Sequence, residues 1–149
     1  MSPETKSLLL RFDEEQAWEF PSNFNARDIE NRARKVFSEL CEAYGKLVFE
    51  DWELHQDASF GLAIAFVSHQ VKNSLRTTQP TIRFSNFGNL ATYTAKELLP
   101  NNAGQDILEA LKRYGFMYVD SEDLDEPHDG VMSPNKAVST WWIRYFDWL

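Results

Sequence analysis

Apolar residues recur at helical spacing between residues 26 and 44. The stripe consists of Ile29, Ala33, Val36, Phe37, Leu40, Cys41 and Tyr44. Asn25 is suited to cap the first turn, and Gly45 can end the helix in a left-handed conformation. Burial of a large apolar side chain contributes ~1.5–3 kcal/mol, whereas ordering each residue costs ~1–2 kcal/mol of backbone entropy. The pattern therefore predicts a helix from about Ala26 to Tyr44 that must pack on a sheet.

The residues after this helix carry the pattern of strands. Residues 47–54 (LVFEDWEL) predict one strand, and residues 60–67 (FGLAIAFV) predict another. The second is apolar throughout, as expected for a strand that is covered on both faces. Its alternate side chains are large on one face and small on the other: Phe60, Leu62, Ile64 and Phe66 against Gly61, Ala63, Ala65 and Val67. The small face can therefore receive a bulky neighbour.

Residues 81–85 and 90–94 predict a hairpin around a turn at residues 86–89. The first of these strands alternates, with Ile82 and Phe84 inward and with three residues outward, Thr81, Arg83 and Ser85. Residues 103–114 predict a second helix, and residues 116–119 predict a short strand. Residues 7–12 (SLLLRF) predict a further short strand, whereas residues 120–129 predict a loop.

The last segment, residues 140–149 (TWWIRYFDWL), predicts a helix, because Thr140, Arg144 and Asp147 recur at spacings of four and three. A strand is the alternative. Strands joined by short turns, with helices inserted singly, predict an α+β fold over a single domain, residues 1–149. We expect an antiparallel or mixed sheet of about four to six strands, flanked by two or three helices that most simply form a single layer.

The net charge of −8 limits the classes of partner. Such a chain repels a phosphate backbone and an anionic lipid surface, so we expect neither a nucleic acid nor a membrane as partner. No stretch approaches the ~18 apolar residues of a membrane span, and the first residues lack the pattern of a secretory signal. Cys41 has no second cysteine to pair with. We therefore expect a cytoplasmic protein, with Cys41 buried and neutral on the helix stripe.

Acidic residues are concentrated in residues 120–129, which we call the acidic segment. Its six carboxylates occur without any Lys or Arg: Asp120, Glu122, Asp123, Asp125, Glu126 and Asp129. The C-terminal segment then supplies four large aromatic residues, Trp141, Trp142, Tyr145 and Trp148. Acidic surfaces steer basic partners, and aromatic anchors supply affinity. The ten residues together predict the contact surface of a non-catalytic interaction protein that binds a basic protein partner.

Two alternatives remain open for the aromatic residues. They can form a terminal helix that packs in the core, on the small face of residues 60–67. They can also mediate a homodimer.

No motif assigns an enzymatic activity. The chain lacks G-x-S-x-G, Walker A, G-x-G-x-x-G, H-E-x-x-H and C-x-x-C patterns, so we assign no catalytic residue, metal ligand or cofactor. His128, which has three acidic neighbours in sequence, is expected at the surface, with a cation site as the minor alternative.

Candidate anion-binding residues lie in a stretch without acidic residues, between residues 58 and 96. They are His69, Lys72, Arg76 and Arg83. A charged, exposed loop is the simpler interpretation of this stretch, and a third is that it pairs with the acidic segment. The alternative function is that of an enzyme or a small-ligand-binding domain with a pocket between sheet and helices.

Overall fold

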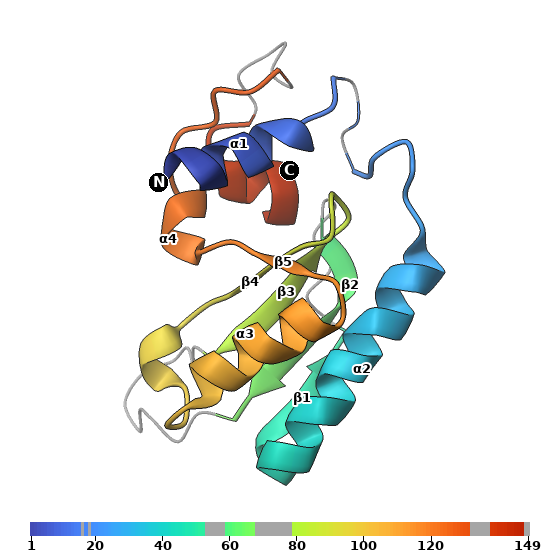
Figure 1. The fold of residues 1–149 in the computed structure, drawn as a ribbon, viewed down its shortest axis with the longest axis vertical. Coiled ribbons are helices and arrows are strands. Elements are labelled where there is room, and N and C mark those ends of the chain that lie inside the picture. The colour runs from blue at the N-terminus through green and yellow to red at the C-terminus, as the bar shows by residue number, and fades with distance from the viewer. Residues whose placement is uncertain (16, 18, 53–58, 68–78, 132–137, 148–149) are drawn as a thin grey trace.

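The computed structural model describes residues 1–15, 17, 19–52, 59–67, 79–131 and 138–147. Within these ranges, five strands form one mixed sheet in the order in which they occur along the chain (Figure 1). The antiparallel strands are β1 (Val48–Asp51), β2 (Ser59–Phe66), β3 (Thr81–Ser85) and β4 (Leu90–Tyr93). The last strand, β5 (Met117–Tyr118), pairs parallel to β4. The fold is therefore of the predicted α+β class.

The two long helices, α2 (Ala26–Tyr44) and α3 (Ala103–Arg113), lie side by side on one face of the sheet (Figure 1). Asn25 caps α2, because its Oδ1 accepts a hydrogen bond of 3.0 Å from the backbone N–H of Asp28. Gly45 ends α2 with a φ of +57° and begins the short 3₁₀ turn η1 (Gly45–Leu47). The predictions of the two helices and of the caps of α2 are confirmed.

The first core fills the space between these helices and the sheet. Its buried strand residues include Leu62, Ile64 and Phe66 of β2 together with Ile82 and Phe84 of β3. The large face predicted for residues 60–67 therefore packs under α2 and α3. Period-two alternation then turns the neighbouring residues of both strands toward the opposite face.

On that opposite face lies the C-terminal helix, which runs from Trp141 into the π-helical turn η3 (Ile143–Asp147) and contacts β2 and β3. Two further elements, α1 (Pro3–Arg11) and the single turn α4 (Ser121–Leu124), lie next to it at one end of the sheet (Figure 1). Their second core consists of Leu9, Phe87, Leu90, Val119, Leu124, Trp141, Tyr145 and Phe146.

The small face of β2 receives the C-terminal helix, as its residue sizes indicated. Ala63 and Ala65 are buried, and η3 contacts both β2 and β3. Thr81 and Ser85 are buried, which corrects the prediction that both face outward. The Ser85 hydroxyl donates a hydrogen bond of 2.7 Å to the carbonyl oxygen of Tyr145. The sequence pattern of β3 could not show that this face is covered from a distance of 60 residues.

Residues 7–11 form the second half of α1, with Phe12 as its C-cap, and not the predicted strand. The helix signals lie just before the leucines: Ser2 Oγ accepts a hydrogen bond of 3.1 Å from the backbone N–H of Thr5, and Pro3 occupies the first turn. Proline is favoured there because the missing N–H would have no helical partner.

The acidic segment is also more regular than predicted, since Asp120 caps α4 by accepting a hydrogen bond of 2.9 Å from Glu122 N–H.

Cys41 is half-buried at the edge of the first core, where we expected it to be fully buried. Burial and, secondarily, the charge of Glu50 raise the pKa of the Cys41 thiol, which keeps it neutral as predicted. Of the helices in the described ranges, none is both long enough and apolar enough to cross a bilayer.

The turn between β3 and β4 supports α1, and this contact leads to a first prediction. Gly88 has a φ of +57°, and a Cβ atom there would lie 2.3 Å from the ring of Phe12. We expect Gly88→Ala to cost about 1–2 kcal/mol through the positive φ and a further ~1–3 kcal/mol by displacing the ring. Urea denaturation measures this loss. In a Phe12→Ala background only the first term should remain, so additive losses would contradict the contact.

Candidate functional site

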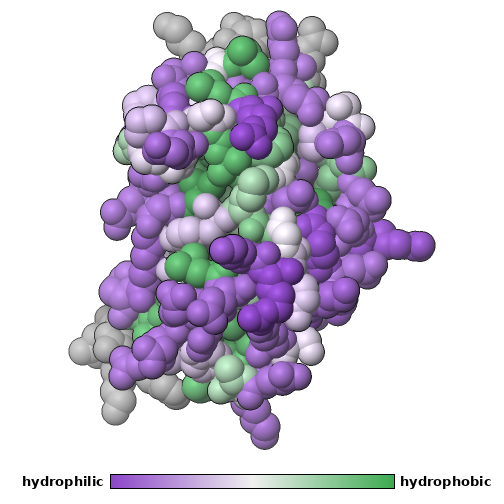
Figure 2. Space-filling model, in the orientation of Figure 1, coloured by the Kyte–Doolittle hydropathy of each residue, from purple (hydrophilic) through white to green (hydrophobic). Residues whose placement is uncertain are grey.

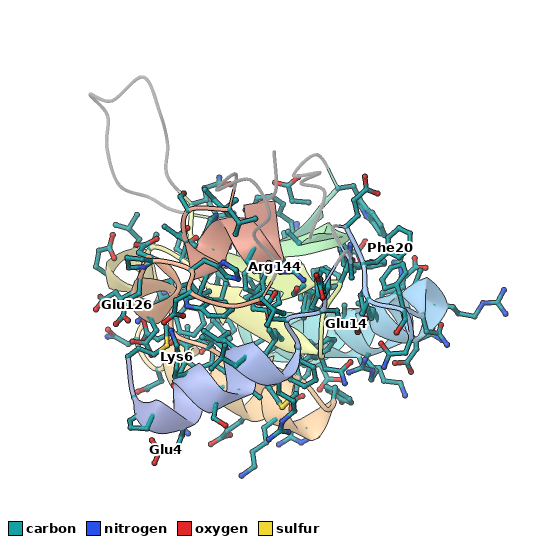
Figure 3. All side chains as sticks on the ribbon, turned by 90° about the horizontal axis from the view of Figure 1, so that it is seen from above. Glu4, Lys6, Glu14, Phe20, Glu126 and Arg144 are labelled. Atoms are coloured by element: carbon teal, nitrogen blue, oxygen red, sulfur yellow. The ribbon has the colours of Figure 1, made fainter. Side chains whose placement is uncertain are left out.

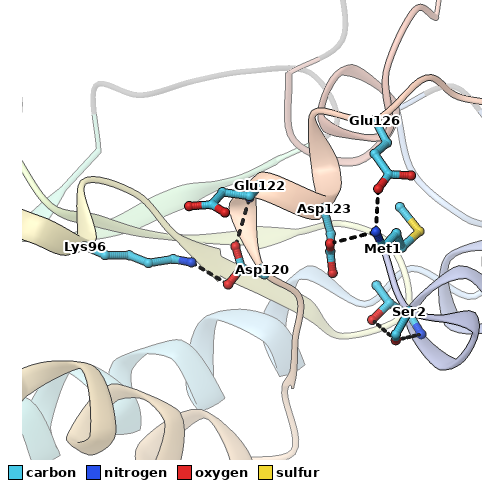
Figure 4. A network of polar contacts seen from close by, with 8 residues as sticks. Met1, Ser2, Lys96, Asp120, Glu122, Asp123 and Glu126 are labelled. Atoms are coloured by element: carbon cyan, nitrogen blue, oxygen red, sulfur yellow. Dashed lines mark hydrogen bonds and ion pairs between the residues drawn. The ribbon is translucent and has the colours of Figure 1, made fainter.

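The acidic segment is paired with cations from two other parts of the chain. Asp120 forms an ion pair with Lys96 in the 3₁₀ turn η2 (Lys96–Leu98), and Asp129 forms one with Lys6 in α1. The amino group of Met1 lies between Asp123 and Glu126, at 3.4 and 2.5 Å (Figure 4). Four of the six carboxylates thus have a partner inside the chain. These contacts attach α1 and η2 to the acidic segment.

The other two carboxylates of the segment point to solvent. Glu122 and Asp125 are exposed, and neither forms an ion pair with a described residue. They stand three residues apart around the single turn of α4, a spacing that places them on the same side of a helix. Leu124, between them in sequence, is buried in the second core.

The pairing changes the acidity of two of these groups. Burial of Asp120 by itself raises the pKa of its carboxyl, but hydrogen bonds from Lys96 and from the backbone of Glu122 outweigh burial and lower that pKa. The hydrogen bond from Lys6 likewise lowers the pKa of Asp129. Both carboxylates therefore stay ionised at a lower pH than an unpaired aspartate.

The aromatic residues of the C-terminal segment divide between core and surface. Trp141 and Tyr145 have no exposed surface, and the Tyr145 hydroxyl donates a hydrogen bond of 2.5 Å to the carbonyl oxygen of Leu9. Trp142 is half-buried and stacks on Phe146, with the ring centroids 5.4 Å apart. Trp148 lies outside the described residues. For Trp141 and Tyr145 the structure therefore supports the core interpretation.

A buried cluster of charged groups joins three segments of the chain that are far apart in sequence. Asp13 Oδ1 accepts a hydrogen bond of 2.6 Å from Arg144 Nε, and Asp13 Oδ2 lies 3.0 Å from His128 Nε2. All three side chains have 0 % exposed surface. The guanidinium of Arg144 also lies over the ring of Phe87, 4.3 Å from its centroid. Figure 3 shows Arg144, which belongs to the C-terminal helix, in the interior of the molecule.

The position of His128 corrects the expectation of a surface histidine. Its carboxylate partner is Asp13, which precedes it by 115 residues, and not one of its acidic neighbours in sequence. The ring also packs edge-on against Trp141, with a centroid distance of 4.5 Å. Gly130 closes over the pair, since a Cβ atom there would lie 1.8 Å from Asp13 Oδ2.

The buried cluster has the features of a structural element. Both oxygens of Asp13 are engaged within the chain, and the three side chains are closed off from solvent. Within the described ranges, no group of three His, Cys, Asp or Glu residues is arranged to hold a metal ion. A surface hollow of about 230 Å³ lies elsewhere, between α2 and α3, and is lined by Lys35, Ser38, Glu39, Glu42 and Tyr114. Ligand sites are typically larger, at ~300–1,000 Å³.

Only one candidate anion-binding residue lies in a described part of the chain. His69, Lys72 and Arg76 lie outside the described residues. Arg83 Nη2 donates a hydrogen bond of 2.8 Å to the carbonyl oxygen of Phe146, and its guanidinium lies over the ring of Trp142. Arg83 therefore contacts the C-terminal helix.

Comparisons with protein-family models, with curated proteins and with solved structures give no match. The functional interpretation therefore depends on the residues themselves. Sequence reasoning missed the buried cluster, although Arg144 carried a signal for it. A charged residue inside a segment as apolar as TWWIRYFDWL needs a buried partner.

The buried cluster predicts an unequal effect of two similar substitutions. Arg144→Met leaves Asp13 buried without its guanidinium partner, and we expect a loss of about 3–5 kcal/mol in the free energy of unfolding. Arg34→Met, the control, removes a half-exposed arginine that pairs with Glu30 and Glu50, and should cost less than about 1 kcal/mol. Chemical denaturation compares the two chains. Equal losses would mean that the cluster does not stabilise the fold.

The ion pair between Asp120 and Lys96 predicts a change in acid titration. In Lys96→Met the burial of Asp120 persists without its main compensation, so the pKa of the carboxyl should rise above its wild-type value. In the wild type, stabilisation by this carboxylate is complete above the ordinary aspartate pKa. It is lost as the pH falls through the lower folded value. NMR titration of the carboxyl carbon measures both chains, and an unchanged pKa in Lys96→Met would contradict the assignment.

Proposed function

We propose that this chain is a non-catalytic interaction protein that binds a basic protein partner. The observation that carries the proposal is the pair Glu122 and Asp125. Both side chains are exposed on one side of α4, and neither has an ion-pair partner among the described residues. In a chain of net charge −8, these two carboxylates extend the negative field outward. Such a field accelerates encounters with positively charged proteins.

The paired carboxylates support the same role, because their partners leave them partly accessible. The Asp129 side chain is 62 % exposed and that of Glu126 is 46 % exposed. Exposed ion pairs of this kind are weak and screened by salt, so an incoming lysine or arginine can compete for them. Steering is thus assigned to Glu122 and Asp125, and the other four carboxylates extend the contact.

The proposal excludes Trp141 and Tyr145 from the contact surface, because both are buried. Trp142, which keeps part of its surface exposed, remains a proposed aromatic anchor, as does Trp148. A homodimer through these two tryptophans is a further hypothesis, which sedimentation equilibrium tests. We also propose a cytoplasmic location. Its support is the lone cysteine, a pattern typical of reducing compartments.

The test is partner capture by a chain that lacks the two steering charges. We expect the immobilised wild type to retain a basic protein from native lysate at low salt and to release it at high salt. Glu122→Gln/Asp125→Asn should slow association by about 2–10-fold and flatten its salt dependence.

The matched control is Glu42→Gln/Glu109→Gln, which removes the same charge from exposed positions on α2 and α3 and should bind like the wild type. Mass spectrometry identifies the captured protein, and biolayer interferometry measures its association rate. Equal rates for both double variants would contradict the proposal.

A further inference from the structure

Helix α1 contacts the rest of the molecule through two kinds of interaction. Its polar side pairs with the acidic segment, because Lys6 Nζ contacts Asp129 and also lies over the ring of Trp141, 5.2 Å from the centroid. Its apolar side contributes Leu9 to the second core, where the leucine has no exposed surface. We call the surface that Met1 and α1 together cover the α1 seat. It consists of Asp123, Glu126 and Asp129 with the apolar residues Val119, Leu124, Trp141 and Tyr145.

The occupant of the α1 seat defines the chemistry that the seat accepts. It is a short helix with a leucine on its inner side and an ammonium group directed at a row of carboxylates. Apolar side chains gather at the surface over α1 and just below it (Figure 2). On α1 itself Leu10 is 42 % exposed, and Leu8 is partly buried against the second core, as is Phe12 at the C-cap. A basic amphipathic helix from another protein meets the same requirements.

The three residues of the buried cluster lie outside α1, so displacement of α1 would leave the cluster intact. Helix α1 has nine residues, fewer than the ~12–15 that an isolated helix needs to be more than marginal in water. Beyond its C-cap, Phe12, the chain is held at once by Asp13, whose carboxylate binds Arg144 and contacts His128. The junction between Phe12 and Asp13 therefore separates α1, which would be marginal as an isolated helix, from a buried anchor.

We propose that the α1 seat is the docking site for a basic amphipathic helix of the partner, and that this helix displaces α1. The inference deepens the proposed function and rests on it, since it assigns the surface and the kind of segment through which the basic partner binds. Helix α1 then acts as an autoinhibitory element. The apparent affinity for the partner is the intrinsic affinity multiplied by the fraction of molecules in which α1 is away from its seat.

This relation predicts a change in affinity that would not be expected if α1 had only a structural role. Weakening the hold on α1 should tighten binding of a competing helix. The probe is a peptide with the sequence of residues 1–12 and a fluorophore at its C-terminus. Its binding to the full-length chain is followed by fluorescence anisotropy. We expect Leu9→Ala to bind this peptide at least tenfold more tightly than the wild type, because alanine fills the second core poorly.

Two further variants test whether a change in affinity arises from the release of α1. Leu40→Ala removes an equally buried leucine from the first core and should bind the peptide no better than the wild type. Lys6→Gln weakens α1 without altering the core, and should tighten binding by about 2–5-fold even if Leu9→Ala fails to fold. A peptide carrying Lys6→Glu should bind all chains more weakly, and the difference should shrink at high salt.

The outcomes separate this inference from the proposed function. Equal peptide affinity in the wild type, Leu9→Ala and Lys6→Gln overturns the docking site. If Glu122→Gln/Asp125→Asn still binds the native partner more slowly than the wild type does, the proposed function stands without the docking site. A wild type that sediments as a dimer and dissociates on adding the peptide also overturns the inference, because the seat then holds α1 of a second copy. Peptide binding without any captured basic protein contradicts the proposed function alone.

Discussion

The arrangement of the chain ends depends on the burial of one arginine. Arg144 has no exposed surface, and its guanidinium can remain there only because Asp13 accepts its hydrogen bond and Phe87 lies beneath it. A buried charge without a partner costs several kcal/mol, so the residue after α1 and the C-terminal helix must meet at this point. His128 on the other oxygen of Asp13 brings the turn after α4 to the same place. Three segments that share no local sequence pattern are thereby held in register.

The two faces of the sheet follow different rules of assembly. The first core joins α2, α3 and the large residues of the strands. The periodic spacing of apolar residues in the sequence predicts each of these elements. Half of the second core, Leu9 and three residues of the C-terminal helix, comes from the chain ends, and these helices are too short or too irregular to be stable alone. Small side chains on β2 make the second layer feasible, because Ala63 and Ala65 let the C-terminal helix approach the sheet. The stability of this layer is therefore a property of contacts between distant residues, and Arg144 and Asp13 are central to them.

The acidic residues have a different role in the structure from the one that their clustering in the sequence indicates. The acidic segment is a run of six carboxylates in sequence, but in the structure four of them bind ammonium groups of the chain itself. These four carboxylates therefore attach α1 and η2 to the acidic segment. The outward-facing remainder, Glu122 and Asp125, gives the segment its proposed part in recognition. A basic competitor can displace exposed ion pairs of this kind. This property links the fold of the chain ends to the proposed binding of a partner.

Periodic patterns along the chain were enough to predict α2 with its Asn25 cap, α3, the β3–β4 hairpin and the two-sided character of β2. Hydrophobic spacing reports which side of an element is buried, and these elements are long or regular enough for that signal to dominate. Residues 7–12 were predicted as a strand although local helix signals, the Ser2 cap and Pro3, precede them. The burial of Ser85 and the partner of His128 could not be predicted from spacing, because each depends on a segment distant along the chain and local sequence does not specify which distant group makes the contact. The six acidic residues were visible as a cluster, but only tertiary contacts with Lys6, Lys96 and the amino group of Met1 decided which of them form ion pairs within the described residues.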